Sequence, residues 1–307
     1  MNPHELIVFT HNDLDALGCM LNIEYRMPNI AKKYFFTNYA NIDQRVQEIE
    51  AHIQENGNTH ILIADVSFSD NKESLRKLYN LGKCTHIDHH LYPDGFWDEF
   101  PNMKVHYDKK KCATLLCNEY FGNTGKHERL DKLTRIIDVY DLWQVGEPEF
   151  KVSQDLNEYF WTYDIELLCK KIVENDYRLP DDFKSVVQAR KAQCEMEVQE
   201  FEERKLIQRN PGMTVAFVKE WFNHIMLKEM EAGQNIVVGI CPYGIVKVRV
   251  NKDAPFTPEQ LNKVRKELTG TENIGHMLAF TYRYEAEKCF ENTIKEVQKI
   301  VQAFANA

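Results

Sequence analysis

An α/β fold with a mainly parallel sheet is the fold class that the sequence predicts, and three observations support it. Short apolar segments typical of buried strands alternate with amphipathic segments typical of helices over about the first half of the chain, which is the pattern of successive βαβ units. Acidic residues or histidines follow several of the apolar segments, as sites do at the carboxyl edge of an open sheet. The pattern changes further along the chain, which indicates a smaller mixed α/β domain at the C-terminal end.

The expected N-terminal domain is a parallel sheet with helices on both faces. Leu14, Leu17, Leu21 and Tyr25 share one face of its first helix, and this spacing is typical of a helix packed on a core. Its expected strands are residues 5–10, 33–37, 60–65, 83–88 and 103–107. Its expected helices are residues 14–27, 43–55, 69–81, 111–121 and 127–141.

The segment 153–209 is charged and reads as helical almost throughout. Its last part, 195–209, predicts a solvated helix that bridges two domains, and Asn210-Pro211-Gly212 would end that helix. The expected elements beyond it are strands at 213–218, 235–241 and 244–250 and helices at 258–268 and 289–304. The predicted organisation is therefore a catalytic domain over 1–150, a helical linker over 151–210 and a substrate-binding domain over 211–307.

Charge and composition restrict the classes of function that the chain can have. The chain has 307 residues and a formal net charge of −9. This charge argues against a broad basic groove for long duplex nucleic acid, but it is compatible with a short nucleotide held by metals and a few cations. The eight cysteines form no C-x-x-C pair, and neither a signal peptide nor an apolar segment of membrane-spanning length is evident. We expect a cytoplasmic protein with reduced thiols and no membrane contact.

Four clusters of carboxylates and imidazoles carry the chemical prediction. Paired carboxylates are hard to keep ionised without a cation between them, and adjacent histidines are costly to bury without a partner. Oxygen and imidazole donors suit hard-to-borderline divalent cations. We therefore expect a two-metal phosphoester hydrolase. The four clusters are Asp13-Leu14-Asp15, Asp65, Asp88-His89-His90 and the pair Asp138 and Asp141.

Several of these residues also have purely structural explanations. Asp13 could cap a helix that begins near Leu14, whereas in an extended segment Asp13 and Asp15 would share one face. Asp65 taken alone could be a turn residue. Gly18 would let the first helix pack close to the sheet, and Trp143 would wall off the pocket.

In their order and spacing, the four clusters resemble the DHH phosphoesterase superfamily. The segment from Thr10 to Cys19, together with Tyr140-Asp141-Leu142-Trp143, is similar to oligoribonucleases of the nanoRNase B type, which are relatives of the exonuclease RecJ. The similarity covers residues 5 to about 145. It implies a manganese-dependent phosphodiesterase or exonuclease.

The resemblance also implies a role for each site residue. Asp65 would bridge two Mn²⁺ ions, with Mg²⁺ or Co²⁺ as alternative metals. His11 is a further candidate ligand, although one residue separates it from Asp13 where many relatives have three. The remaining roles are Asp13 on one metal, Asp15, His89 and Asp141 on the other, His90 on the scissile phosphate, Asp88 as the residue that orients the histidine pair, and Asp138 as a supporting residue.

The C-terminal part resembles the DHH-associated domain. The segment 273–276, which includes Gly275 and His276, corresponds to a glycine-rich loop but has one glycine of three. Lys247, Arg249 and Asn251 would share one face of a strand, and an arginine can hold a phosphate with two hydrogen bonds. The resemblance implies that Arg249, Asn251, Gly275 and His276 bind substrate. The alternative for this strand is a half-exposed sheet edge.

The expected activity is hydrolysis of short RNA oligomers to mononucleotides. The alternatives are a linear or cyclic dinucleotide phosphodiesterase, a RecJ-like single-strand DNA exonuclease, and a manganese pyrophosphatase or exopolyphosphatase. Two further alternatives are not enzymes: a nucleotide-sensing binding module and a structural α/β protein. The expected partner is a short oligonucleotide or dinucleotide, and a homodimer is compatible with the sequence.

Overall fold

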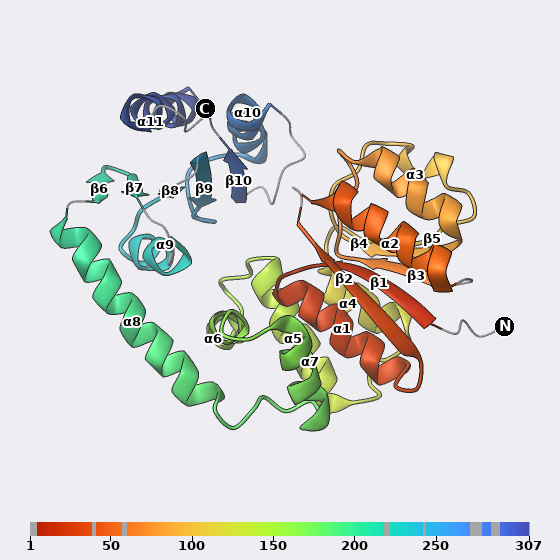
Figure 1. Ribbon diagram of the computed structural model, residues 1–307. Helices are drawn as coiled ribbons and strands as arrows, with labels where there is room; N and C mark the ends of the chain where they lie inside the picture. Colours follow the sequence, from red (N-terminus) through yellow and green to blue (C-terminus); the bar gives the residue numbers. More distant parts are fainter. Residues whose placement is uncertain are drawn as a thin grey trace. The chain divides into compact units, whose positions relative to one another are not determined.

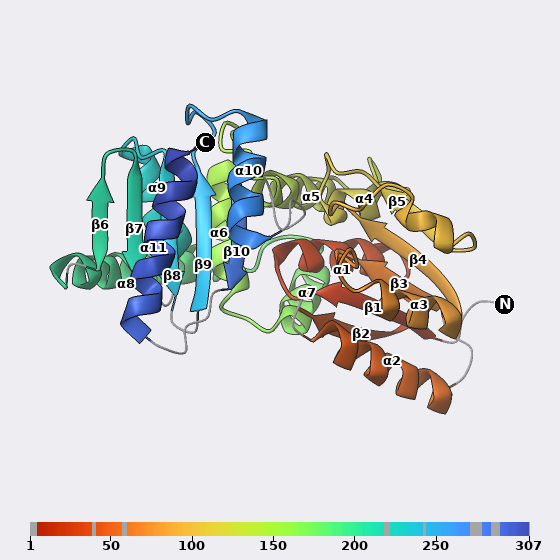
Figure 2. The ribbon, with the colours of Figure 1, turned by 90° about the horizontal axis from the view of Figure 1, so that it is seen from above.

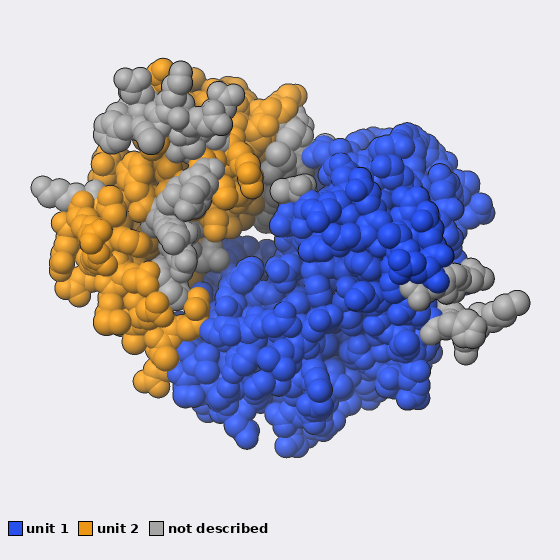
Figure 3. Space-filling model, viewed as in Figure 1, with its two compact units in different colours: residues 1–187 blue, residues 188–307 orange. Residues whose placement is uncertain are grey.

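The structure is a computed structural model in which residues 5–38, 41–56, 60–204, 206–217, 222–241, 244–270, 278–283 and 289–306 are described. The internal contacts of the chain divide it into two compact units, Met1–Val187 and Gln188–Ala307 (Figure 3). Each unit has a sheet and a hydrophobic core of its own. No helix within the described ranges is both long and apolar enough to cross a membrane.

The first unit is built on a parallel five-stranded sheet in the order β2-β1-β3-β4-β5 (Figure 1). The chain leaves β1 toward one edge and returns at β3 to build toward the other edge. The direction of winding therefore reverses between β1 and β3, and ligands bind at such a switch point in open α/β sheets. The strands are β1 (Glu5–His11), β2 (Ala31–Thr37), β3 (His60–Ala64), β4 (Lys83–Asp88) and β5 (Lys104–Tyr107).

Helices cover both faces of this sheet, as the sequence predicts. Along β1, Leu6 and Val8 pack into a core with α1 and α4, whereas Ile7 and Phe9 pack into a core with α2 and α3. Strands buried on both faces read as continuous apolar runs, which explains why β1 is recognisable in the sequence. The helices are α1 (Leu14–Arg26), α4 (Ala113–Tyr120), α5 (Glu128–Asp141), α6 (Phe150–Phe160) and α7 (Ile165–Glu174) on one side, with α2 (Ile42–Asn56), α3 (Lys72–Leu81) and the short η1 (Phe96–Glu99) on the other.

Gly18 in α1 permits a close helix contact, but the partner differs from the expected one. A Cβ atom at this position would lie 2.0 Å from Oγ1 of Thr114 in α4 and 2.8 Å from Cδ1 of Ile137 in α5. The missing side chain therefore brings α1 against two helices rather than against the sheet. This contact matters for the site because α1 and α4 both carry groups that meet there.

The second unit contains a mixed five-stranded sheet in the order β10-β9-β8-β7-β6 (Figure 2). β7 and β8 are parallel, and the other neighbouring pairs are antiparallel. α10 (Pro258–Thr269) and α11 (Cys289–Ala305) pack on one face, and α9 (Phe222–Glu231) contacts β7 and β8. The strands are β6 (Ile207–Asn210), β7 (Met213–Phe217), β8 (Ile236–Cys241), β9 (Ile245–Val250) and β10 (Ala279–Arg283).

The expected continuous helix over 195–209 is wrong in its last part. The long helix α8 (Phe183–Glu203) ends earlier, and residues 207–210 form β6, which pairs with β7. Gly212, with φ +75°, lies in the turn between the two strands. β6 lies at the edge of the sheet, pairs with β7 and is mostly exposed. Its residues are therefore mainly polar and do not show the apolar pattern of a buried strand. α9 and β10 were likewise not predicted.

Candidate metal centre

The carboxyl edge of the first sheet gathers the acidic residues that the sequence singled out. Asp88 ends β4, Asp65 directly follows β3, and Asp13 lies two residues beyond β1. Since these strands are parallel neighbours, their carboxyl ends meet at one edge. The switch point between β1 and β3 thus lies between Asp13 and Asp65.

Asp13 has two structural functions at once. Its Oδ1 accepts a hydrogen bond from the backbone N–H of Ala16 at 3.0 Å, so it caps α1, and its Oδ2 lies 2.6 Å from Nδ1 of His11. Burial opposes ionisation of Asp13, but the charge and hydrogen bond of His11 outweigh it and lower the pKa of the carboxyl. Burial likewise opposes protonation of His11, and Asp13 outweighs it and raises the pKa of the imidazole.

Asp15 does not share an extended face with Asp13, because it lies in the first turn of α1. Its carboxylate accepts hydrogen bonds from the N–H groups of Ala113 and Thr114, both at 2.8 Å. These N–H groups begin α4, and a helix N-terminus stabilises a negative charge. The buried Asp15 is therefore oriented by α4, and its Oδ2 lies 3.7 Å from Nε2 of His89.

Asp65 has the most strained setting in the site. Its backbone has φ +57°, a conformation that residues other than glycine rarely adopt. Its Oδ2 is buried and has no hydrogen-bond partner among the described residues, and its Oδ1 lies 3.5 Å from Nε2 of His89. Burial, together with the charges of neighbouring carboxylates, raises its pKa well above the usual value. A cation beside this carboxylate would stabilise its ionised form.

Asp88 orients the histidine pair. Its Oδ1 accepts a hydrogen bond from the backbone N–H of His89 at 2.9 Å and lies 2.7 Å from Nδ1 of His90. Its Oδ2 accepts a hydrogen bond from the Tyr92 hydroxyl. Burial opposes ionisation of Asp88, but His90 outweighs it, so the pKa of Asp88 falls below its usual value.

Asp141 and Asp138 lie one helical turn apart in α5 but face different partners. Oδ2 of Asp141 lies 3.5 Å from Nε2 of His89 and has no hydrogen-bond partner among the described residues. Burial and the nearby Asp15 raise the pKa of Asp141. Oδ1 of Asp138 instead accepts a hydrogen bond from the backbone N–H of Cys112 at 3.0 Å, which holds the segment before α4 in place. Asp138 is thus a support.

Among the described residues, three groups of side chains have the donor types and spacing that a divalent cation requires. Within each group the ligand atoms all lie within 4.8 Å of one another. His89 and Asp65 each belong to two groups, so the three groups form one continuous centre. The groups are His11, Asp13 and Asp65; Asp15, His89 and Asp141; and Asp65, Asp88, His89 and His90.

The residues present fit a pair of divalent cations. Two buried carboxylate oxygens, those of Asp65 and Asp141, have no hydrogen-bond partner in the described part of the chain. Burial and, after it, nearby like charges raise the pKa of both carboxyls, and a cation between them would offset this cost. The donors are oxygen and imidazole nitrogen, as Mn²⁺ and Mg²⁺ prefer.

Two contributors to the centre were not predicted. Tyr92 belongs to no acidic cluster, and the N–H groups at the start of α4 have no side-chain signature. The start of an expected helix near residue 111 was the available signal, because helix N-termini bind anions. Tyr92 had no such signal, because its hydroxyl meets Asp88 only when the chain turns back after β4.

The substrate residues predicted for the C-terminal part lie in the second unit. Burial alternates along β9, with Val246, Val248 and Val250 buried and the intervening Lys247 and Arg249 half-buried, so the shared face is confirmed for these two residues; Asn251 lies one residue beyond the strand. Arg249 Nη1 donates a hydrogen bond to the carbonyl of Val248 at 2.9 Å. The amide of Asn251 donates to the carbonyl of Gln234 at 3.5 Å. Gly275 and His276 lie outside the described residues.

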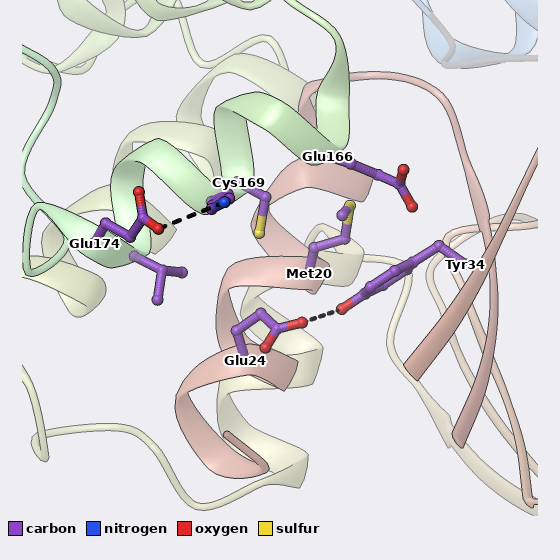
Figure 4. Close-up of a pocket in the computed structure, with 8 residues that line it drawn as sticks. Met20, Glu24, Tyr34, Glu166, Cys169 and Glu174 are labelled. Atoms are coloured by element: carbon purple, nitrogen blue, oxygen red, sulfur yellow. Dashed lines mark hydrogen bonds and ion pairs between the residues drawn. The ribbon is translucent and has the colours of Figure 1, made fainter. Parts of the chain in front are cut away.

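A separate cavity of the first unit lies between α1, β2 and α7 (Figure 4). Tyr34 donates a hydrogen bond to Oε1 of Glu24 at 2.7 Å, and Lys32 donates to Oε2 of the same carboxylate at 2.8 Å. The carboxylate of Glu24 is therefore already paired. The cavity contains none of the residues of the metal centre, and its lining is Met20, Glu24, Tyr34, Glu166, Cys169, Lys170, Val173 and Glu174.

Solved structures share this fold at low sequence identity. Exonuclease RecJ bound to manganese matches with a TM-score of 0.60 and 15% identity, over 99% of this chain and 90% of that one. RecJ from Thermus thermophilus in complex with Mn²⁺ matches with a TM-score of 0.64 and 15% identity, and the match spans 99% of this chain but 52% of that one. The pGpG-specific phosphodiesterase PggH from Vibrio cholerae matches with a TM-score of 0.57 and 14% identity, over 99% and 100% of the two chains.

These similarities define the class of fold. The chain shares its fold with RecJ and with the pGpG-specific phosphodiesterase, so the fold implied by the resemblance to DHH phosphoesterases is confirmed. No protein-family model and no curated protein sequence matches the chain.

Proposed function

We propose that the protein is a metal-dependent phosphodiesterase that hydrolyses short oligonucleotides to mononucleotides, with two Mn²⁺ ions at the carboxyl edge of the first sheet. The observation that carries this proposal is the continuous centre in which His89 and Asp65 are each shared between groups of potential ligands. The fold supports it, because the similar structures include a manganese-bound exonuclease and a phosphodiesterase.

The chemistry follows from the arrangement of the residues. Two divalent cations at such a centre would supply Lewis acidity and a nucleophilic water at neutral pH. Asp15 and Asp65 would serve as metal ligands whose carboxylates are held in place. The N-terminus of α4 orients Asp15, and the turn after β3 orients Asp65. His90 would donate from Nε2 to a phosphoryl oxygen, since Nδ1 faces Asp88. Asp88 would hold that imidazole in one orientation.

A linear dinucleotide is the second candidate substrate. One similar structure is a pGpG-specific phosphodiesterase, and the match spans 99% of this chain and 100% of that one. The net charge of −9 also favours substrates with few phosphates, because long polyanions would be repelled beyond the site. Dinucleotides and short oligomers differ only in the number of nucleotides that lie outside the metal centre.

One experiment compares these substrates directly. Purified protein with Mn²⁺ is incubated in parallel with a labelled dinucleotide, a five-residue RNA, a long single-stranded DNA and pyrophosphate. We expect the dinucleotide and the short RNA to be cleaved fastest, with mononucleotides as the product. The proposal is wrong if only pyrophosphate is hydrolysed or if no phosphodiester is cleaved with Mn²⁺, Mg²⁺ or Co²⁺.

Two variants test whether the proposed centre carries the activity. Asp88→Ala and His89→Ala should each lower hydrolysis by about a hundredfold or more, because they remove the support of the imidazole and a metal ligand. Circular dichroism should show an unchanged fold. A nucleotide-sensing module without catalysis would instead bind the dinucleotide and leave it intact in the wild type.

A further inference from the structure

The segment of residues 107–111, which we call the rim segment, is fixed at both ends to the metal centre. At its start, Tyr107 is the register partner of Asp88 across β4 and β5. Just beyond its end, the N–H groups of Ala113 and Thr114 donate to the carboxylate of Asp15. The rim segment therefore runs along the edge of the centre, from the carboxylate that orients His90 to the one beside His89.

Tyr107 presents an aromatic ring at this edge. Its exposed fraction is 38%, which is high for a large apolar side chain. Its ring centroid lies 5.8 Å from that of Tyr92 in an edge-on arrangement, and Tyr92 donates its hydroxyl hydrogen to Asp88. The ring of Tyr107 is thus supported from one side by a residue of the centre while a large part of it faces solvent.

The lysines of the rim segment differ in their pairing. Lys111 is bound by Glu119, with Nζ 2.8 Å from Oε1 and 2.9 Å from Oε2. Lys109 and Lys110 are exposed, and neither has an ion pair with any residue of the described ranges. Asp108 accepts a hydrogen bond from the backbone N–H of Lys110 at 2.9 Å and so fixes the turn that presents both lysines.

We propose that the rim segment is a nucleotide subsite, in which Tyr107 stacks on the base next to the scissile phosphodiester and Lys109 and Lys110 hold the following phosphate. This inference rests on the proposed phosphodiesterase function and adds a substrate class to it: single-stranded oligonucleotides with a base and a second phosphate beside the cleaved bond. Aromatic stacking combined with backbone cations is how proteins hold single strands without reading their sequence. Two exposed cations beside an acidic centre are otherwise unexplained in a chain with a net charge of −9.

The subsite predicts different effects for its two parts. The measurement is binding of a fluorescent, non-hydrolysable phosphorothioate trinucleotide in the presence of Mn²⁺, followed by anisotropy at several salt concentrations. Tyr107→Ala should weaken binding about tenfold, whereas Tyr107→Phe should bind as the wild type does, because the ring is retained. Lys109→Ala combined with Lys110→Ala should reduce the slope of log Kd against log salt by about 0.7, since the two lysines hold one phosphate and each phosphate neutralised on a single strand contributes roughly 0.7.

The matched control is Lys77→Ala combined with Lys132→Ala. These lysines are also exposed, they lie on α3 and α5, and their removal changes the net charge equally. This control should leave both the affinity and the salt slope unchanged. If the two double variants change the slope equally, the lysines act only through overall charge and the subsite is wrong.

A second substrate separates failure of the subsite from failure of the proposed function. Bis(p-nitrophenyl) phosphate is a phosphodiester without bases or a second phosphate. Tyr107→Ala should lower kcat/KM for a trinucleotide at least fivefold more than for this compound. If the wild type cleaves oligonucleotides but both rim variants bind and cleave them normally, the subsite is wrong and the enzyme proposal stands. If the wild type cleaves no phosphodiester, the enzyme proposal is wrong, and the binding measurements still decide whether the rim holds a nucleotide.

Discussion

The two sheets of this protein place polar side chains in different ways. In the first sheet all strands are parallel, and the reactive residues follow the strands and gather at the carboxyl edge. In the second sheet most strand pairs are antiparallel, and the polar residues alternate within a strand, as Lys247 and Arg249 do on β9. One sheet builds a centre at an edge, and the other presents cations on a face.

This difference determines how densely charge can be concentrated. At the edge of the first sheet, Asp65 and Asp88 come from neighbouring strands, and helix termini add Asp15 and Asp141. Within a strand, side chains on one face are separated by two residues, so they are spaced about 7 Å apart. An edge can therefore enclose a cation, whereas a face is suited to contacts with an extended anion. The following predictions test that distinction.

The largest effect is expected for the residue shared at the edge. Asp65→Asn should reduce oligonucleotide hydrolysis by roughly three orders of magnitude, because the neutral amide cannot serve two cations. It should also abolish the stabilisation that Mn²⁺ gives the wild type, which would be about 2.7 kcal/mol at a hundredfold excess over Kd and is observed as a rise in melting temperature. A hydrolysis assay measures the first effect, and thermal unfolding followed by calorimetry with and without Mn²⁺ measures the second.

Without metal, Asp65→Asn should instead increase the folding stability of the protein. Burial and neighbouring carboxylates raise the pKa of Asp65. Its contribution to folding stability is therefore present below the usual pKa of an aspartate and is lost as pH rises through the folded value. Asp65→Asn should remove that loss and make the metal-free protein more stable at neutral pH. Asp70→Asn, at an exposed position after the same strand, should change neither property.

A smaller effect is expected from the helix contact that supports the edge. Gly18→Ala should lower the free energy of unfolding by about 3 kcal/mol, because the new Cβ would lie 2.0 Å from Oγ1 of Thr114. Urea denaturation measures this change. Thr114 donates hydrogen bonds to the carboxylate and to the backbone carbonyl of Asp15, so displacing Thr114 should disturb this proposed ligand. The affinity for Mn²⁺ should therefore fall as well.

A double-mutant cycle checks the cause. Thr114→Ala removes both atoms of Thr114 that a Cβ at Gly18 would meet, so Gly18→Ala should cost less in that background. Additive losses in the double variant would mean that the clash with Thr114 is not the reason.

The smallest effect is expected on the face of the second sheet. Arg249→Ala should weaken oligonucleotide binding about tenfold, which corresponds to the loss of one charge-assisted contact, and should leave the Mn²⁺-induced shift in melting temperature unchanged. Lys266→Ala is the control, because that exposed lysine lies on α10, which covers the opposite face. An altered Mn²⁺ shift in Arg249→Ala would contradict the separation of edge and face.

Much of the first unit could be predicted from the sequence because its signals are local. The buried run of β1 and the acids that follow β1, β3 and β4 are contiguous in the chain, and parallel pairing brings their ends together without further information. The prediction failed at β6, which is polar and forms a strand by pairing with β7 across a two-residue turn. Asp13 and Asp15 left two alternatives open in the sequence, and the structure adopts the one in which Asp13 caps α1 and Asp15 lies in its first turn.

The sequence by itself determined which residue types stand at the strand ends and hence that a cation centre is possible, since oxygen and imidazole donors and strand periodicity are properties of neighbouring residues. The tertiary structure decided what fixes those donors. The N–H groups of α4 hold Asp15, Tyr92 holds Asp88, and the missing side chain of Gly18 lets α1 and α4 meet. The contacts of Asp15 and of Gly18 with α4 join residues far apart in the chain, whereas Tyr92 reaches Asp88 through the turn after β4; all of them depend on distances of a few ångströms that only packing sets.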